Sequence, residues 1–198
     1  MVRKGIRVLG VLLILLGIII IGVNKVGDYL VIKKEKKEVE LFLKENNSKS
    51  GDLVNGQESD FNNNKSNYVA VLEIPKIELE RGLVSINSED NDVSKNIQVL
   101  ESSIFPVTEV GNLYLAGHSG DGKNAYFKDL DKLEIGDYIY LYYYGGRYDY
   151  YVYDIYNIPK TGAVVVDRKE SNNLYMITCS YENDNEQLLV RAKIIGNK

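Results

Sequence analysis

The sequence of 198 residues contains one cysteine, Cys179, and one histidine, His118, and this pair is its best candidate for covalent chemistry. Each residue follows a run of apolar, β-forming residues: LYMIT precedes the cysteine and LYLAG precedes the histidine. Such runs are typical of buried strands, so we expect both side chains at strand ends. A thiol and an imidazole that meet in space can act as a nucleophile and its proton partner. Taken singly, each residue is also compatible with a buried structural role.

The strands that would position this pair begin near residue 68. Residues 138–158 contain ten tyrosines, divided between the two sides of Gly145 and Gly146. Two β-forming runs joined by two glycines predict a long hairpin with a type I′ turn. Other short runs predict two strands within 68–84 around Pro75, and strands at 112–117, 163–166, 174–178 and 188–195. Leucine and phenylalanine spacing over 126–133 predicts one or two helical turns, closed by Gly136. Many short strands without a βαβ rhythm predict a closed or nearly closed β-barrel.

The N-terminal part predicts a membrane anchor. Residues 8–23 form an uncharged run of 16 residues that follows three basic side chains. As a helix this run would be about 24 Å long, so flanking residues must extend to the surface of a hydrocarbon core about 30 Å thick. No small-residue cleavage site follows, which favours a retained signal anchor. We therefore expect a single-pass protein of the cell membrane with its folded domain outside the cell.

This organisation gives three predicted segments. Residues 1–27 form the transmembrane segment, and residues 68–198 form the folded domain. Between them, residues 28–44 are rich in charges with interspersed apolar residues, which predicts a helix next to the membrane. Residues 46–67 are rich in asparagine, serine and glycine, which predicts a flexible tether.

The charge balance excludes nucleic acid as a partner. Without residues 1–24, which hold three basic and no acidic residues, the chain has 21 basic and 28 acidic residues, a net charge of −7. Phosphate backbones are bound by an excess of lysine and arginine. Glu182, Asp184 and Glu186 alternate, but they lack the central glycine and closing glutamate of an EF-hand loop, so a solvated turn is favoured. We predict no metal and no cofactor; calcium is possible but not indicated.

Four motifs in order resemble the sortases, the cysteine transpeptidases that attach proteins to the cell walls of Gram-positive bacteria. They are LEIPKI at 72–77, LAGHS at 115–119, YFKDLDKLEIGD at 126–137 and MITC at 176–179. The resemblance covers about residues 68–195. It implies an all-β fold, a closed eight-stranded sortase-type barrel with one or two short helices, after an N-terminal transmembrane helix. The short loop at 159–173 resembles class D forms, and the S-Y-E after Cys179 resembles class B, so the class stays open.

The resemblance also implies the reaction of a thiol protease that acts as an acyl transferase. Cys179 would attack an LPxTG-like sorting motif of a secreted protein and form an acyl-thioester, while His118 protonates the departing amine. An amine of a cell-wall precursor or a pilin would then take the acyl group. Thr178 and Gln187 are the candidates for binding the substrate or the oxyanion.

The sequence departs from the family at an arginine. Sortases use an arginine on the last strand to stabilise the substrate or the oxyanion. Alignment of LLVRAKII puts Gln187 at that place and Arg191 four residues later, about 13 Å along the same strand face. We keep Arg191 as the arginine candidate, and Arg147 and Arg168 are less favoured alternatives. The departure keeps open an alternative, a catalytically inactive binding module on the same fold.

One further segment resembles a substrate. Residues 158–162 read IPKTG, like a sorting signal, but no hydrophobic span and basic tail follow them. We interpret them as a loop that leaves the predicted hairpin.

Overall fold

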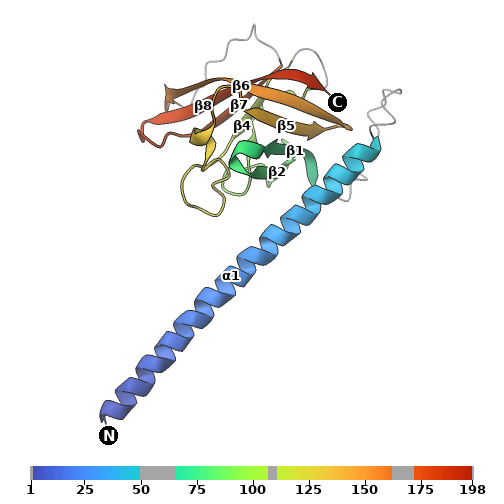
Figure 1. The fold of residues 1–198 in the computed structure, drawn as a ribbon. Coiled ribbons are helices and arrows are strands. Elements are labelled where there is room, and N and C mark those ends of the chain that lie inside the picture. The colour runs from blue at the N-terminus through green and yellow to red at the C-terminus, as the bar shows by residue number, and fades with distance from the viewer. Residues whose placement is uncertain (1, 50–65, 107–110, 162–171, 198) are drawn as a thin grey trace. The chain divides into compact units, whose positions relative to one another are not determined.

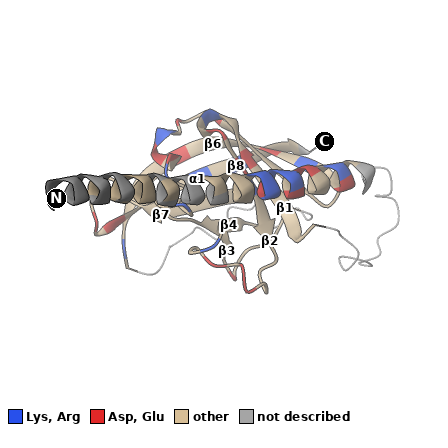
Figure 2. Ribbon diagram, turned by 90° about the horizontal axis from the view of Figure 1, so that it is seen from below, with Lys and Arg blue, Asp and Glu red and all other residues tan. Residues whose placement is uncertain are grey.

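The computed structural model describes residues 2–49, 66–106, 111–161 and 172–197. The chain divides into two compact units, Met1–Lys37 and Glu38–Lys198. A single helix, α1, spans Val2–Lys49 and contains the whole predicted helix at 28–44. Figure 2 shows that charged residues gather in the C-terminal part of α1. Over the described ranges, no helix combines the length and the apolarity that a membrane span requires.

Eight strands form one sheet in the described chain, in the order β2-β1-β5-β6-β8-β7-β4-β3 (Figure 1). Their bounds are β1 Tyr68–Ile74, β2 Leu79–Val84, β3 Gln98–Val99, β4 Leu113–Ala116, β5 Tyr138–Tyr143, β6 Gly146–Pro159, β7 Asn173–Cys179 and β8 Glu186–Asn197. Neighbouring strands are antiparallel except β4 and β7, which are parallel. The strand predicted at 163–166 lies outside the described residues.

Side-chain hydrogen bonds join the two edge strands, β2 and β3. Asn96, two residues before β3, donates to the carbonyl of Gly82 at 3.1 Å and accepts from the Arg81 guanidinium at 2.9 Å. Both partners lie in β2, and Asn96 and Arg81 are buried. Because an unpaired edge exposes backbone donors and acceptors, covering it protects the sheet. The eight strands thus form the nearly closed barrel that the strand pattern predicted.

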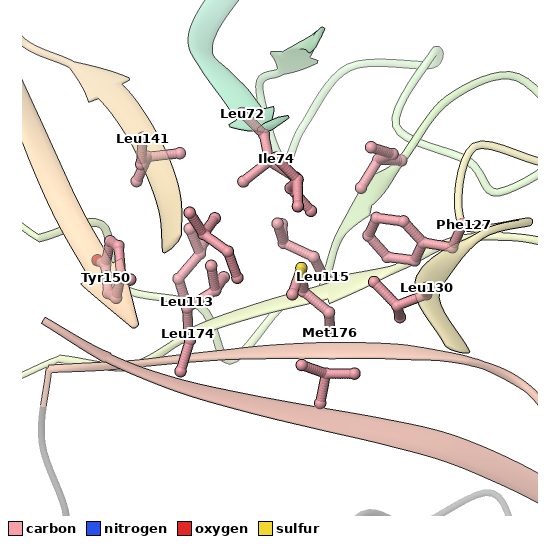
Figure 3. Packing of buried hydrophobic residues seen from close by; sticks show 14 of the residues in the cluster. Leu72, Ile74, Leu113, Leu115, Phe127, Leu130, Leu141, Tyr150, Leu174 and Met176 are labelled. Atoms are coloured by element: carbon pink, nitrogen blue, oxygen red, sulfur yellow. The ribbon is translucent and has the colours of Figure 1, made fainter. Parts of the chain in front are cut away.

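Alternate residues of the strands fill the barrel. In β4 and β7, Leu113, Leu115, Leu174 and Met176 are almost fully buried, at every second position as strand geometry requires. They belong to one cluster that also includes side chains of β1, β5, β6 and β8. Figure 3 shows these side chains converging from different strands, with Phe127 at one end of the cluster. This packing holds β4 and β7, the two strands that lead to His118 and Cys179.

The end of α1 belongs to the same folded unit as the barrel. Val39 and Phe42 are buried and pack in one cluster with Tyr68, Val71 and Val84 of β1 and β2. Residues 46–49, predicted as the start of the tether, continue α1, because this packing supplies a partner for the apolar face of the helix. The rest of the predicted tether, up to residue 65, lies outside the described residues.

The predicted hairpin forms, but its turn lies one residue earlier than expected. Tyr143 pairs with Gly146, so the two loop residues are Tyr144 and Gly145, with φ of 48° and 81°. Asn46 of α1 accepts a hydrogen bond from the Gly145 N–H at 2.7 Å and donates to the Gly146 carbonyl at 3.2 Å. A type I′ turn needs positive φ at both loop residues, so the prediction that both are glycines was wrong.

Two short 3-10 helices complete the described fold. One spans Pro75–Ile77 and separates β1 from β2, as the proline predicted. The other spans Leu130–Lys132 and buries Leu130 in the barrel core. The C-cap of this helix is Leu133, so the prediction that Gly136 closes it was wrong. Gly136, with φ of 99°, lies in the following turn, in which the Asp137 N–H donates to the Glu134 carbonyl at 3.1 Å.

Candidate active site

The parallel strands β4 and β7 place the histidine and the cysteine side by side. Their register pairs Ala116 with Ile177. Beyond β4, the Gly117 N–H donates to the Ile177 carbonyl at 3.1 Å, and the Thr178 hydroxyl donates to the Gly117 carbonyl at 2.8 Å. His118 and Cys179 are therefore the next two residues in register at the same edge of the sheet.

Both reactive side chains are accessible. Cys179 is a free cysteine of intermediate exposure, and His118 is exposed. The residues just before them, Gly117 and Thr178, are buried. The chain thus moves from core to surface at the two positions where a nucleophile and a proton carrier must meet a substrate.

The segment after His118 is anchored by its backbone. The Phe127 N–H donates to the His118 carbonyl at 3.0 Å, and the buried Phe127 ring lies against Gly117. A Cβ at Gly117 would lie 2.7 Å from the Phe127 ring, so only glycine allows this close approach. Phe127 therefore supports the backbone that carries the imidazole.

Two further ionisable groups lie near the pair. Burial raises the pKa of Tyr181, and the negative charges of Asp131, Asp129 and Cys179 raise it further. The Tyr181 hydroxyl donates to the Phe127 carbonyl at 2.7 Å. Tyr181 thus stays a neutral donor that links the turn after Cys179 to the segment after His118.

Asp92 lies on the histidine side. Hydrogen bonds from Ser94 to its carboxylate lower the pKa of Asp92, with smaller contributions from Lys95 and His118. The carboxylate therefore stays negative near the imidazole.

The thiol also has a basic neighbour that the sequence analysis did not select. The Lys160 ammonium lies 3.8 Å from the sulfur of Cys179. Lys160 belongs to the IPKTG segment, which was predicted as a loop, but its first two residues, Ile158 and Pro159, end β6 and pair with Gln187 and Glu186 of β8. The pairing of β6 with β8 brings this lysine to the site, and no pattern in the local sequence indicates that pairing.

The other predicted site residues have different positions. Gln187 is the direct cross-strand partner of Cys179, so both side chains lie on the same face. Thr178 is buried, and its hydroxyl is bound to Gly117. Arg147 forms an ion pair with Asp149 at 2.7 Å next to the hairpin turn, and Arg168 lies outside the described residues.

Arg191 is not brought to the thiol. It lies opposite Tyr175 in the β7–β8 ladder, four residues along each strand from the pair of Gln187 and Cys179. Its guanidinium forms a 3.2 Å ion pair with Asp154 and lies 4.9 Å above the ring of Tyr153.

The arrangement suits acyl transfer by a thiol. A thiolate supplies the nucleophile, an adjacent imidazole moves the proton, and a cation favours the thiolate. No group of carboxylate, histidine and cysteine side chains in the described ranges has the geometry of a metal site.

A comparison of the sequence with protein families decides the affiliation. The family profile described as "Sortase domain" matches residues 72–195, which contain both His118 and Cys179. The chain belongs to the sortase family. This match confirms the resemblance found in the four sequence motifs. Sortases are cysteine transpeptidases.

Individual sortases are similar over most of this chain. Sortase A of Bacillus anthracis is 25% identical over 202 residues, which cover 96% of this chain and 95% of that protein. The solved sortase D5 transpeptidase of Clostridium perfringens is 25% identical, with a TM-score of 0.59 over 82% of this chain and 98% of that chain. Sortase A of Listeria monocytogenes, at 21% identity and a TM-score of 0.54 over 67% of this chain and 90% of that chain, has the same fold.

Proposed function

We propose that this sortase is a membrane-anchored transpeptidase that cleaves an LPxTG-like sorting motif and transfers the acyl group to an amine. The observation that carries the proposal is the register of β4 and β7, which continues through Gly117 and Thr178 to His118 and Cys179. A nucleophile and its proton partner must lie within contact of one substrate. Accessible side chains at adjacent strand ends meet that requirement.

The first half of the reaction acylates the enzyme. The Cys179 thiolate attacks the carbonyl carbon of the threonine-like residue, and the resulting oxyanion collapses to a thioester as the carbon–nitrogen bond breaks. His118 donates a proton to the departing amine, which leaves as a neutral group. The acyl group is then held on sulfur, and the part of the substrate after the motif is released.

The second half restores the thiol. The amine of a cell-wall precursor or a pilin attacks the thioester carbonyl and loses a proton to His118. The carbon–sulfur bond then breaks, the thiolate of Cys179 is regenerated and a new amide bond is formed. The thioester conserves the acyl energy of the original amide, so no nucleotide is consumed.

A quenched-peptide assay tests this proposal. The full chain is incubated with LPxTG-like and NPxTN-like fluorogenic peptides, with and without an amine acceptor, next to Cys179→Ala and His118→Ala. We expect cleavage and an amide product from the unaltered chain, and a loss of at least about 10³-fold in turnover in both variants. Equal signals from the chain and from Cys179→Ala would refute the enzymatic function.

A second candidate function is a binding module without activity. The observation that favours it is Gln187, a neutral residue in the position directly opposite Cys179. In that case sorting peptides would bind both the unaltered chain and Cys179→Ala, and neither would release product. Peptide binding measured beside cleavage separates the two functions.

We also propose that the uncharged run at 8–23 anchors the protein in the cell membrane with residues 68–198 outside. The anchor is supported by the length of the run and its lack of charges, and the outward orientation by the seven-residue segment before the run and the large domain after it. Liposome flotation of the full chain and of a chain without residues 1–27 tests the anchor. We expect the full chain to float with the liposomes and the shortened chain to stay in the soluble fraction. Recovery of both chains in the soluble fraction would refute the anchor.

A further inference from the structure

We propose that Lys160 is a catalytic residue whose ammonium holds the Cys179 thiolate, in place of an arginine on β8. The proposal rests on the proposed function and deepens it, because it assigns the positive charge of the active site. The observation is a contact of 3.8 Å between the lysine nitrogen and the sulfur, the atom that forms the acyl bond. A cation at this distance favours the thiolate over the thiol.

Backbone contacts join the segment around Lys160 to β8, the strand that carries Gln187, the cross-strand partner of Cys179. Pro159 pairs with Glu186 of β8, and the Lys160 N–H donates to the Asn185 carbonyl at 2.8 Å. Residue 160 therefore begins its side chain from a defined position at the end of β6, although the side chain itself is exposed.

The lysine reaches the sulfur across one strand. In the sheet order, β8 lies between β6 and β7, and Gln187 pairs with Ile158 on one side and with Cys179 on the other. Neighbouring strands are about 4.8 Å apart, so the two outer strands are separated by about 10 Å. The four-carbon stem of lysine has the length to cover most of that distance and bring its charge to the thiol.

The charge is needed at this place. Gln187, directly opposite the thiol, is neutral, and the Arg191 guanidinium is bound to Asp154 four residues along β8. Three carboxylates follow Cys179 closely in the chain, in the turn between β7 and β8 and at the start of β8. They are Glu182, Asp184 and Glu186. Their negative charges disfavour the thiolate form of Cys179.

The groups around the thiol come from four places. Gln187 lies opposite it on β8, His118 follows β4, Tyr181 lies in the turn after β7, and Lys160 follows β6. Tyr181 stays neutral, because burial raises its pKa. Of these groups, the imidazole and the lysine are the two that can carry a positive charge.

The assignment also explains the segment that resembles a sorting signal. In IPKTG, Ile158 and Pro159 complete β6, and the following lysine lies at the thiol. The first three residues of the motif are thus part of the active-site wall.

The rate of Cys179 alkylation by iodoacetamide, measured in the full chain from about pH 5 to pH 9, tests the proposal, because only the thiolate reacts. In Lys160→Met, which keeps the length of the stem and removes the charge, we expect the midpoint of the pH profile to rise by about one unit. At a pH below both midpoints, the rate should fall about tenfold. Lys160→Arg should return the rate to within about threefold of the original.

Lys193→Gln serves as the matched control. Lys193 is exposed on β8, six positions from Gln187, and pairs with Tyr151 and Asn173 rather than with residues at the thiol. We expect its alkylation profile to match that of the unaltered chain. An unchanged midpoint in Lys160→Met, or an equal shift in Lys193→Gln, would overturn the assignment.

The alkylation assay is independent of any sorting peptide. If Lys160→Met shifts the alkylation profile but the unaltered chain cleaves no peptide, the proposed function is refuted and the effect of Lys160 on the thiol stands. If the chain cleaves peptide but Lys160→Met leaves the profile unshifted, the proposed function stands and the role of Lys160 is refuted. With cleavable peptides, Lys160→Met should lower kcat and leave KM within about twofold, which an effect on substrate binding alone would not produce.

Discussion

The hydroxyl of Thr178, the residue before Cys179, donates a hydrogen bond of 2.8 Å to the carbonyl of Gly117, the residue before His118. Both residues are buried, so the bond is protected from water. It extends the parallel register of β4 and β7 beyond the last backbone pair and aligns the two reactive residues at one edge of the sheet.

Thr178→Val is expected to weaken this alignment. The change keeps the shape of the side chain but leaves the buried Gly117 carbonyl without its donor, which costs about 1–2 kcal/mol of the free energy of unfolding. We expect a lower kcat as well, because the imidazole loses its position relative to the thiol. Urea denaturation and peptide turnover measure both effects. Thr178→Ser, which keeps the hydroxyl, should behave like the original chain; equal losses in the two variants would contradict the role of the bond.

Gly117→Ala is expected to disturb the support of His118. The added methyl group would lie 2.7 Å from the Phe127 ring, inside van der Waals contact. Overpacking of this kind costs about 1–3 kcal/mol, which thermal or urea unfolding detects. Gly122→Ala lies in the same segment and meets no atom within 4 Å, so its unfolding free energy should change little. A stable Gly117→Ala would mean that Phe127 moves away without cost.

Phe42→Ala tests whether the end of α1 is part of the folded unit. Phe42 is 5% exposed and packs against Tyr68, Val71 and Val84, so its removal leaves a cavity worth about 3 kcal/mol. The measurement is the free energy of unfolding of the barrel, followed by the circular dichroism of its strands. Leu30→Ala changes an exposed residue of the same helix and should cost less than about 0.5 kcal/mol. Equal stability of both variants would show that the helix end does not support the barrel.

Tyr142 predicts a loss of stability at alkaline pH. Burial and a hydrogen bond to the Glu73 carboxylate raise the pKa of Tyr142 to about 12. A tyrosine in the unfolded chain ionises near pH 10, so the contribution of the neutral phenol is complete below about pH 10 and is lost as the pH rises toward 12.

Urea denaturation at about pH 8 and about pH 11 measures this loss. Tyr142→Phe should lose less stability between the two pH values than the original chain, because the group that must ionise is absent. Tyr138→Phe, at an exposed position of the same strand, should follow the original chain. An identical alkaline loss in Tyr142→Phe and the original chain would refute the prediction.

Arg191→Met is expected to affect stability more than catalysis. The guanidinium is bound to Asp154 and lies over the ring of Tyr153, so loss of the charge should cost about 1 kcal/mol. We expect kcat for peptide cleavage within about threefold of the original value. Gln187→Ala, at the position opposite the thiol, provides the comparison. A collapse of kcat in Arg191→Met alone would assign the stabilisation of the transition state to that arginine.

The local sequence was sufficient to predict most of the strands. Apolar alternation and β-forming residues indicated β1, β4, β7 and β8, and Pro75 indicated the break between β1 and β2. These signals are local, because strand preference and chain breaks depend on neighbouring residues. The same reasoning placed Cys179 and His118 at strand ends, and their identity as the only thiol and the only imidazole made them visible.

Contacts between distant parts of the chain decided the rest. The Asn46 side chain binds the backbone of the turn at Tyr144 and Gly145, although Asn46 lies 99 positions before Gly145. The pair of glycines therefore indicated the hairpin but not its loop residues. The position of Lys160 beside Cys179 depends on the pairing of β6 with β8 and of β8 with β7. Strand order and register arise from packing over the whole barrel, and a sequence pattern read over a few residues holds no information on which strands become neighbours.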